Sequence, residues 1–239
     1  EKCIYRLKFI RYTAVSHSTK KQLLRLGISP NKIKVIYNGV DYERWDPRKY
    51  DREKIRKKLQ LQKNFVYLFH GRPGTSKGLK YLIKAVPLIS ELIPQAKLVA
   101  MVSRDPAYQK NYQQILRRIK KLKIEDSIRL LPPVNYQELP DYIKAADCVV
   151  VPSLAEGFGF SVAEACAMDV PVVATNTTSI PEVISGKYVL VPPKNQRALA
   201  EGVWAVYQKK YHQKPKKLFK IEENIEGYIY EYKKMLRIK

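Results

Sequence analysis

Residues 65–78 read FVYLFHGRPGTSKG, and this stretch decides the fold class. Its first five residues, Phe65 to Phe69, are apolar, as in a strand that is covered on both sides of a parallel sheet. A loop rich in glycine follows, and an amphipathic run from Gly78 to Leu92 predicts a helix. The stretch therefore predicts a βα unit whose loop lies at the carboxyl end of its strand.

The rest of the chain repeats this alternation of short apolar runs and longer amphipathic runs. Further strands are predicted at Lys97 to Val102, Ile128 to Leu131, Cys148 to Pro152, Val172 to Ala174 and Tyr188 to Val191, and further helices at Ala107 to Leu122, Gln137 to Ala146, Phe160 to Met168, Ile180 to Ser185 and Arg197 to Tyr211. We therefore expect an α/β domain with a Rossmann-like parallel sheet and helices on both faces. Such sheets bind ligands beyond the carboxyl ends of their strands.

Turn residues and periodicity divide the chain into four parts. Residues 1–37, with a helix near Tyr5, short strands at 13–15 and 33–36 and a helix at 19–26, indicate the end of another Rossmann-like unit. Residues 38–64 begin with turn residues and are expected to connect the two units. Residues 65–217 form the main domain, and the amphipathic residues 218–239 are predicted to form a closing helix.

The composition restricts partners and compartment. The 45 Lys and Arg against 22 Asp and Glu give a net charge of +23, which favours phosphates, nucleic acid or anionic lipid as partners. The three cysteines lie far apart in apolar runs, so neither a disulfide framework nor a zinc site is predicted. No apolar stretch approaches the roughly 20 residues that span a bilayer, and a cytoplasmic location is expected. Because the sequence lacks an initiator Met, we expect it to begin inside a longer polypeptide.

The glycine-rich loop is the first candidate site. Gly71 and Gly74 let the backbone approach a ligand, the next helix presents free N–H groups, and Arg72 and Lys77 add two cations. These features favour a diphosphate ligand. The residue order is not that of a Walker A motif, so ATP hydrolysis is not predicted. The alternative is an ordinary βα turn with surface cations.

Residues 152–164, PSLAEGFGFSVAE, form the second candidate site. Glu156 is expected in the loop after a strand, and Glu164 in the helix that follows it. A carboxylate can accept two hydroxyl groups of a ribose. Backbone N–H groups that can donate to sugar hydroxyls or phosphate are those of Gly157, Phe158, Gly159 and Phe160. The alternative makes Glu156 a solvated loop acid and Glu164 a charge near a helix start.

The Gly-Arg…Lys-Gly loop followed by Glu-x7-Glu resembles glycosyltransferase family 4, the retaining group 1 enzymes with the GT-B fold. The stretches at 36–41, IYNGVD, and 180–184, IPEVI, match the same family. The resemblance implies that the chain is mainly the C-terminal donor-binding lobe, with a remnant of the N-terminal lobe. Two departures are Asp169 in place of a usual glycine and a Thr177-Thr178 pair where many members have two glycines.

The resemblance also implies residue roles. Arg72 and Lys77 would contact the donor diphosphate, Glu156 would lie at the transferred sugar, and Glu164 would hold the ribose. Arg72, Lys77 and Glu156 are thus the predicted catalytic residues. Asn135, after the strand at 128–131, could flank the nucleobase or belong to a surface loop.

The implied function is that of a retaining hexosyltransferase that moves a sugar from a nucleoside-diphosphate sugar to an unidentified glycan or lipid-linked acceptor. No metal or other cofactor is expected, since cations and helix starts would stabilise the leaving group. With one lobe mostly absent, this chain is expected to bind donor without robust turnover. Peripheral association with the cytoplasmic face of a membrane is a further expectation.

The competing hypothesis is a non-enzymatic basic domain that binds nucleic acid or an anionic membrane surface. Nucleic acid is not the expected partner, because Lys and Arg are spread over helices without interleaved aromatic residues. Of the three histidines, His70 is expected to be a buried residue at a strand end rather than a general base.

Overall fold

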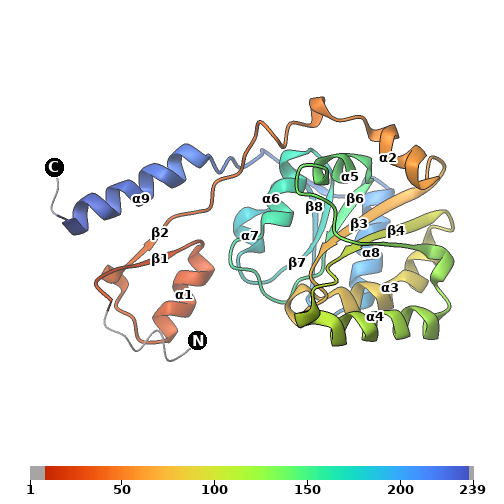
Figure 1. Cartoon of the computed structure of the whole chain (residues 1–239), viewed down its shortest axis with the longest axis horizontal. Coiled ribbons are helices and arrows are strands. Elements are labelled where there is room, and N and C mark those ends of the chain that lie inside the picture. Colours follow the sequence, from red (N-terminus) through yellow and green to blue (C-terminus); the bar gives the residue numbers. More distant parts are fainter. Residues whose placement is uncertain (1–8, 237–239) are drawn as a thin grey trace.

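The computed structural model describes residues 9–236, so the helix predicted near Tyr5 lies outside the described residues (Figure 1). The main domain contains a seven-stranded sheet in the order β5-β4-β3-β6-β7-β8-β9. Its strands are β3 (Phe65–Gly71), β4 (Ala96–Val102), β5 (Ile128–Leu131), β6 (Cys148–Val151), β7 (Val172–Thr175), β8 (Gly186–Val191) and β9 (His212–Lys214). The predicted α/β class and the parallel strands are confirmed.

The unpredicted strand β9 pairs antiparallel with β8 at the sheet edge. All three of its residues are polar and exposed, so it has no apolar pattern that would mark it in the sequence. It makes the sheet mostly parallel rather than wholly parallel.

The strand order reverses at β3, which pairs with β4 on one side and β6 on the other. The chain runs outward from β3 to β5 and then crosses back to β6, as in a Rossmann sheet. Ligands of such sheets lie in the crevice at this reversal, outside the carboxyl ends of the strands. The loops after β3 and β6 are therefore the expected place for a site.

Helices cover both faces of this sheet (Figure 1). On one face, the side chains of Tyr67 and Phe69 pack with α3 (Leu79–Leu92), α4 (Gln109–Leu122) and α8 (Gln196–Tyr207). On the other, Val66 and Leu68 pack with α2 (Arg52–Leu59), α5 (Leu139–Ala145), α6 (Phe160–Ala167) and α7 (Ile180–Val183). Alternate residues of β3 thus enter two separate cores, which explains its unbroken apolar sequence.

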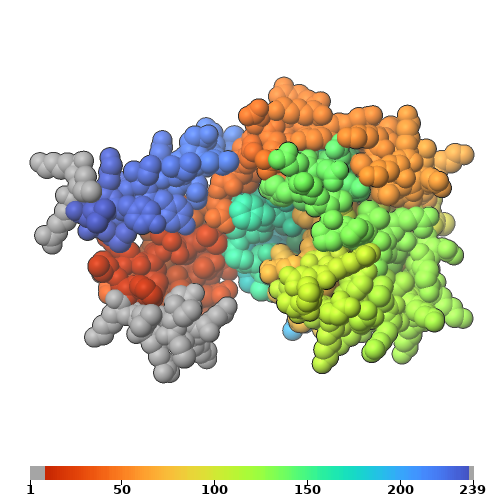
Figure 2. Space-filling view, in the orientation of Figure 1, coloured from red at the N-terminus to blue at the C-terminus, as the bar shows by residue number. Residues whose placement is uncertain are grey.

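The N-terminal unit has its own two-stranded parallel sheet of β1 (Tyr12–Ala14) and β2 (Ile33–Val35), with α1 (His17–Arg25) between them in sequence. The C-terminal helix α9 (Ile221–Leu236) lies beside this unit rather than on the large sheet (Figures 1 and 2). Asn224 Nδ2 donates to the carbonyl oxygen of Tyr37 at 2.6 Å. Helix α9 therefore leads the chain back to its N-terminal unit.

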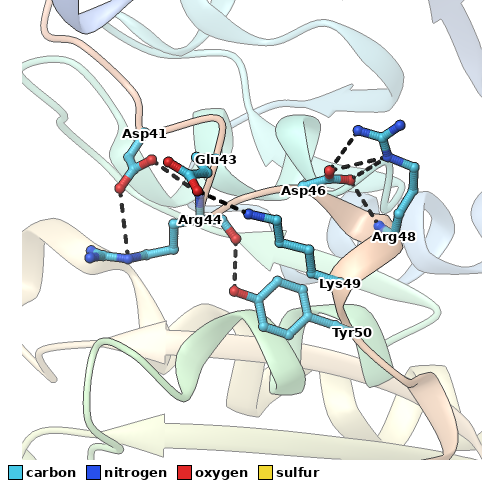
Figure 3. Close-up of polar contacts among 7 residues, drawn as sticks. All are labelled: Asp41, Glu43, Arg44, Asp46, Arg48, Lys49 and Tyr50. Atoms are coloured by element: carbon cyan, nitrogen blue, oxygen red, sulfur yellow. Dashed lines mark hydrogen bonds and ion pairs between the residues drawn. The ribbon is translucent and has the colours of Figure 1, made fainter.

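The connecting segment of residues 38–50 is held by local hydrogen bonds (Figure 3). The Asp41 carboxylate accepts from the backbone N–H of Arg44 at 3.0 Å, and the Tyr50 hydroxyl donates to the Arg44 carbonyl oxygen at 2.8 Å. Trp45, within this segment, is 1% exposed and belongs to the core beside α5 and α6. The connection is thus folded onto the main domain.

Candidate functional site at the reversal of strand order

The loops after β3 and β6 contact each other through their backbones. The N–H of Leu154 donates to the carbonyl oxygen of Ser76 at 2.6 Å. Gly78 adopts a left-handed conformation (φ +66°), and a Cβ at this position would lie 1.8 Å from the carbonyl oxygen of Pro152. Only glycine therefore lets the two loops approach this closely.

The contact brings two predicted catalytic residues together. Lys77 Nζ lies 2.8 and 3.0 Å from the two carboxylate oxygens of Glu156. The carboxylate also accepts from the Ser153 hydroxyl at 2.7 Å, and the Glu156 N–H donates to the Thr178 hydroxyl at 2.9 Å. The Glu156 side chain is 11% exposed, and the bonds from Lys77 and Ser153 hold its carboxylate in one orientation.

Glu164, on α6, is 3% exposed. Its carboxylate accepts from the hydroxyl of Tyr136 at 3.0 Å. Burial raises the pKa of Glu164 to about 7, and the hydrogen bond from Tyr136 and the nearby charge of Lys77 oppose this rise. The charged form that could accept sugar hydroxyls thus depends on these two neighbours.

Tyr136 is a site residue that the sequence analysis missed. Its ring is contacted by the edge of Trp45, with ring centroids 5.7 Å apart, and by the guanidinium of Arg44, 4.9 Å from the ring centroid. The connecting segment therefore supports the hydroxyl that holds Glu164. The signal in the sequence was weak: an aromatic residue in the loop after β5, next to Asn135.

We predict that Tyr136→Phe raises the pKa of Glu164 further above its ordinary range, because the variant loses the hydrogen bond that lowers it. The ring contacts with Trp45 and Arg44 would remain. The chemical shift of the Glu164 carboxyl carbon, followed by NMR as the pH is raised, measures the pKa of this carboxyl group. An unchanged pKa would show that the Tyr136 hydroxyl does not stabilise the carboxylate.

Other predicted site residues have different partners. Arg72 is exposed, and its Nη1 donates to the Tyr108 hydroxyl at 3.0 Å. A Cβ at Gly74 would lie 3.2 Å from a ring carbon of Tyr108. Asn135 uses its side-chain oxygen to accept from the N–H of Gln137 at 3.1 Å, so it stabilises the turn before α5. The structure thus brings neither Arg72 nor Asn135 into the Lys77–Glu156 ion pair.

The segment from Gly157 to Phe160 contains both residues that belong to the core and residues that are exposed. Phe158 is 3% exposed, and its side chain packs against Tyr37 and Phe219, so only its backbone can face a ligand. Phe160 is 46% exposed. Gly159 has φ +103° and directly precedes α6, which begins at Phe160. Gly71, at φ +148°, makes the corresponding bend at the end of β3.

His70 lies at the end of β3 as expected and is half-buried. Burial and the charge of Lys77 lower its pKa to about 4, so the imidazole is neutral at physiological pH. Its Nε2 is buried without a hydrogen-bond partner among residues 9–236.

Among residues 9–236, no group of three His, Cys, Asp or Glu side chains has the arrangement of a metal site. No helix of the described chain is long and apolar enough to cross a membrane.

Family models match almost the whole chain. The model for glycosyl transferases group 1 matches residues 51–225, and that for glycosyltransferase family 4 matches residues 4–44. The chain therefore belongs to the group 1 glycosyl transferases, and the resemblance seen in its motifs is confirmed.

Individual relatives agree with this assignment. An uncharacterized glycosyltransferase of Methanocaldococcus jannaschii is 35% identical over 195 residues, which are 79% of this chain and 48% of the relative. D-inositol 3-phosphate glycosyltransferase 1 of Catenulispora acidiphila is 34% identical over 206 residues, 82% of this chain and 48% of the relative. The chain thus spans about half the length of the curated relatives it matches.

Solved structures share the fold. HepE of Anabaena, in complex with UDP and glucose, has a TM-score of 0.75 at 20% identity over 93% of this chain and 62% of HepE. Sucrose-phosphate synthase of Thermosynechococcus elongatus has a TM-score of 0.78 at 21% identity over all of this chain and 61% of the synthase. Both support the GT-B architecture.

Proposed function

We propose that this chain forms the donor-binding half of a retaining hexosyltransferase that uses a nucleoside-diphosphate sugar. The observation that carries the proposal is the Lys77–Glu156 ion pair at the reversal of strand order, together with the buried Glu164, which lies near enough to Lys77 to be affected by its charge. In this proposal Lys77 binds the diphosphate, the Glu156 carboxylate binds the sugar and the Glu164 carboxylate binds the ribose. The UDP complexes of HepE support a nucleotide sugar as the ligand of this fold.

Each group has a chemical task in this proposal. When the bond between the sugar and the diphosphate breaks, the diphosphate keeps the electron pair, and Lys77, Arg72 and the start of α3 stabilise its charge. Glu156 orients the sugar, and Glu164 accepts hydrogen bonds from the ribose. No metal is needed in this scheme, since the protein's own cations balance the charge of the leaving group.

For the acceptor we propose a glycan or a lipid-linked molecule, with peripheral membrane association. Helix α4 carries exposed cations, including Lys120 and Lys121, that could bind anionic headgroups. Its apolar residues Ile115 and Ile119 are buried against the domain. Membrane binding through α4 would therefore be electrostatic, without insertion of an apolar helix face.

The experiment is a calorimetric titration with UDP-, GDP- and ADP-sugars, with and without a chelator, beside a transfer assay. We expect one base to be preferred, no effect of the chelator and no robust turnover by this chain alone. Lys77→Met should weaken donor binding by about tenfold or more, because it removes a charge-assisted contact with the diphosphate.

Lys120→Met is the matched control, since it removes one charge from α4 and leaves the loops intact. Equal losses in both variants, or binding without preference for any base, would contradict a donor site. Efficient turnover by the chain would contradict the idea that most of the second lobe is required.

A further inference from the structure

A cavity of about 630 Å³ lies at the amino ends of the parallel strands. Among its lining residues, Phe65 begins β3, Asp147 directly precedes β6 and Lys187 lies near the start of β8. Lys77 and Glu156 lie on loops that follow the carboxyl ends of β3 and β6, so the cavity is at the opposite end of these strands. Its volume is within the range of about 300–1,000 Å³ that is typical of small-molecule sites. A ligand in this cavity would therefore not compete with a ligand at the donor loops.

Cations outnumber acids in the wall of this cavity, which contains five Lys and Arg residues and two Asp residues. The first acid, Asp147, is fully engaged. Its two carboxylate oxygens accept from the guanidinium groups of Arg52 and Arg56. One of these oxygens also accepts from the N–H of Val66 at 2.6 Å. Asp147 therefore has no carboxylate oxygen left that lacks a cation.

The second acid, Asp169, is engaged by two lysines. Its Oδ2 lies 3.0 Å from Lys187 Nζ, and its Oδ1 lies 3.6 Å from Lys216 Nζ. Asp169 stands where the family pattern has a glycine, which could bind neither lysine. Both acids of the wall are thus neutralised by cations of their own, and they leave the other lysines of the wall without a counter-charge.

Two cations of the wall, Lys144 and Lys209, have no partner. Among residues 9–236, neither side chain makes a hydrogen bond or an ion pair. Helix C-termini attract cations, but at the end of α5 this task falls to two arginines. Arg52 and Arg56 donate to the last carbonyl oxygens there, at 3.4 and 2.9 Å. The two lysines are therefore left to bind an anion that enters the cavity.

The two unpaired lysines approach the cavity from opposite faces of the large sheet. Lys144 lies on α5, which covers one face, and Lys209 follows α8, which covers the other. Tyr211 also lines the cavity, and its hydroxyl has no hydrogen-bond partner in the described part of the chain. Two cations from separate walls and a free hydroxyl donor suit a ligand that has more than one anionic group. Phosphate groups combine this charge with several acceptor oxygens.

We propose that this cavity is a second ligand site that binds an oligophosphate, either a free di- or triphosphate or the phosphate chain of a nucleotide. Lys144 and Lys209 bind separate phosphate groups, and the Tyr211 hydroxyl donates to a phosphate oxygen. The rings of Phe65 and Tyr207, which also line the cavity, offer an apolar surface to the base of a nucleotide. The inference does not depend on the proposed function, because none of the described residues that line the cavity belongs to the loops after β3 and β6.

The test is an amide NMR titration of the labelled chain with tripolyphosphate, at constant ionic strength, without divalent cations and with excess UDP-glucose. Tripolyphosphate should shift the amides around Lys144 and Lys209 saturably, and orthophosphate should bind at least about tenfold more weakly. Lys144→Gln with Lys209→Gln should weaken tripolyphosphate binding by about tenfold. Lys120→Gln with Lys121→Gln removes the same charge from α4 and should change affinity by no more than about twofold.

Asp169→Asn tests the charge of the cavity in the opposite direction. It removes a negative charge and frees Lys187, so the affinity for tripolyphosphate should rise by about threefold. Asparagine also tolerates the left-handed conformation of Asp169, whose φ is +57°. Since misfolding would not strengthen binding, a rise in affinity identifies the effect of charge, and an unchanged or lower affinity would contradict the proposal.

Pyrophosphate and ADP distinguish the two sources of the phosphate groups. Tighter binding of ADP at the amides around Lys144 and Lys209 assigns a nucleotide, and equal or weaker binding assigns a free oligophosphate. Shifts confined to the loops after β3 and β6, equal losses in the two double variants, or equal affinity for orthophosphate would overturn the proposal. UDP-glucose alone should shift the amides of those loops, so its failure to do so would sink the proposed function and leave the result at Lys144 and Lys209 intact.

Discussion

Glu164→Gln is expected to weaken nucleotide-sugar binding by about a hundredfold while making the unliganded chain more stable above pH 7. The loss of affinity follows because a neutral amide replaces the carboxylate that would accept two ribose hydroxyls. The gain in stability follows because a charge 3% exposed to solvent is removed. A residue that only supports the fold would not show these opposite effects.

The pH dependence makes this expectation sharper. The pKa of Glu164 is raised from 4.5 to about 7, so the folded chain binds the proton more tightly than the unfolded chain. Stability from this group is present below pH 4.5 and is lost as pH rises through about 7. The Glu164→Gln variant lacks this titration. Its free energy of unfolding should therefore exceed that of the native chain by up to about 3 kcal/mol above about pH 7, whereas the titration should contribute no difference below pH 4.5.

Urea unfolding at both ends of this range, together with calorimetric donor titration, measures both effects. Glu226→Gln, an exposed acid on α9, is the matched control and should change neither quantity. A stability difference that is the same at low and high pH would show that the charge of Glu164 is not the cause. Undiminished donor affinity would remove Glu164 from the site.

The sequence was sufficient to predict elements that have a regular pattern of apolar residues. It was insufficient to predict contacts between polar residues that lie far apart in the chain. Strands such as β3 and β6 were predicted because both faces are buried, and polar β9 was not. Arg56 shows the limit most clearly, since it lies in charged α2 and is nevertheless 5% exposed. Its guanidinium binds the Asp147 carboxylate at 2.5 Å, a partner 91 residues away that no local pattern reveals.

The same limit applies to the candidate site. Lys77, Glu156 and Glu164 could be proposed because glycine-rich loops at strand ends give a local signal. Tyr136 could not, because its role depends on a hydrogen bond to a residue 28 positions away. The aromatic packing of Phe158 is also a tertiary property, and from sequence this residue was indistinguishable from its neighbour Phe160.

Gly78→Ala is expected to destabilise the chain by about 4 kcal/mol and to abolish donor binding. About 1–2 kcal/mol of this arises because alanine must adopt φ +66°, and the rest because its Cβ would lie 1.8 Å from the Pro152 carbonyl oxygen. That neighbour is backbone and cannot turn aside as a flexible side chain would. The loops after β3 and β6 must therefore separate, which would break the approach of Lys77 to Glu156.

Gly27→Ala provides a matched control, because Gly27 also has a positive φ, +85°, but has no atom within 4 Å of its projected Cβ. Its expected loss is about 1 kcal/mol, with donor binding unchanged. Urea unfolding of the two variants separates the conformational contribution from the clash between loops. If both variants lose equal stability, the close approach at Pro152 contributes nothing; if Gly78→Ala alone loses the donor, the contact between the loops is what assembles the site.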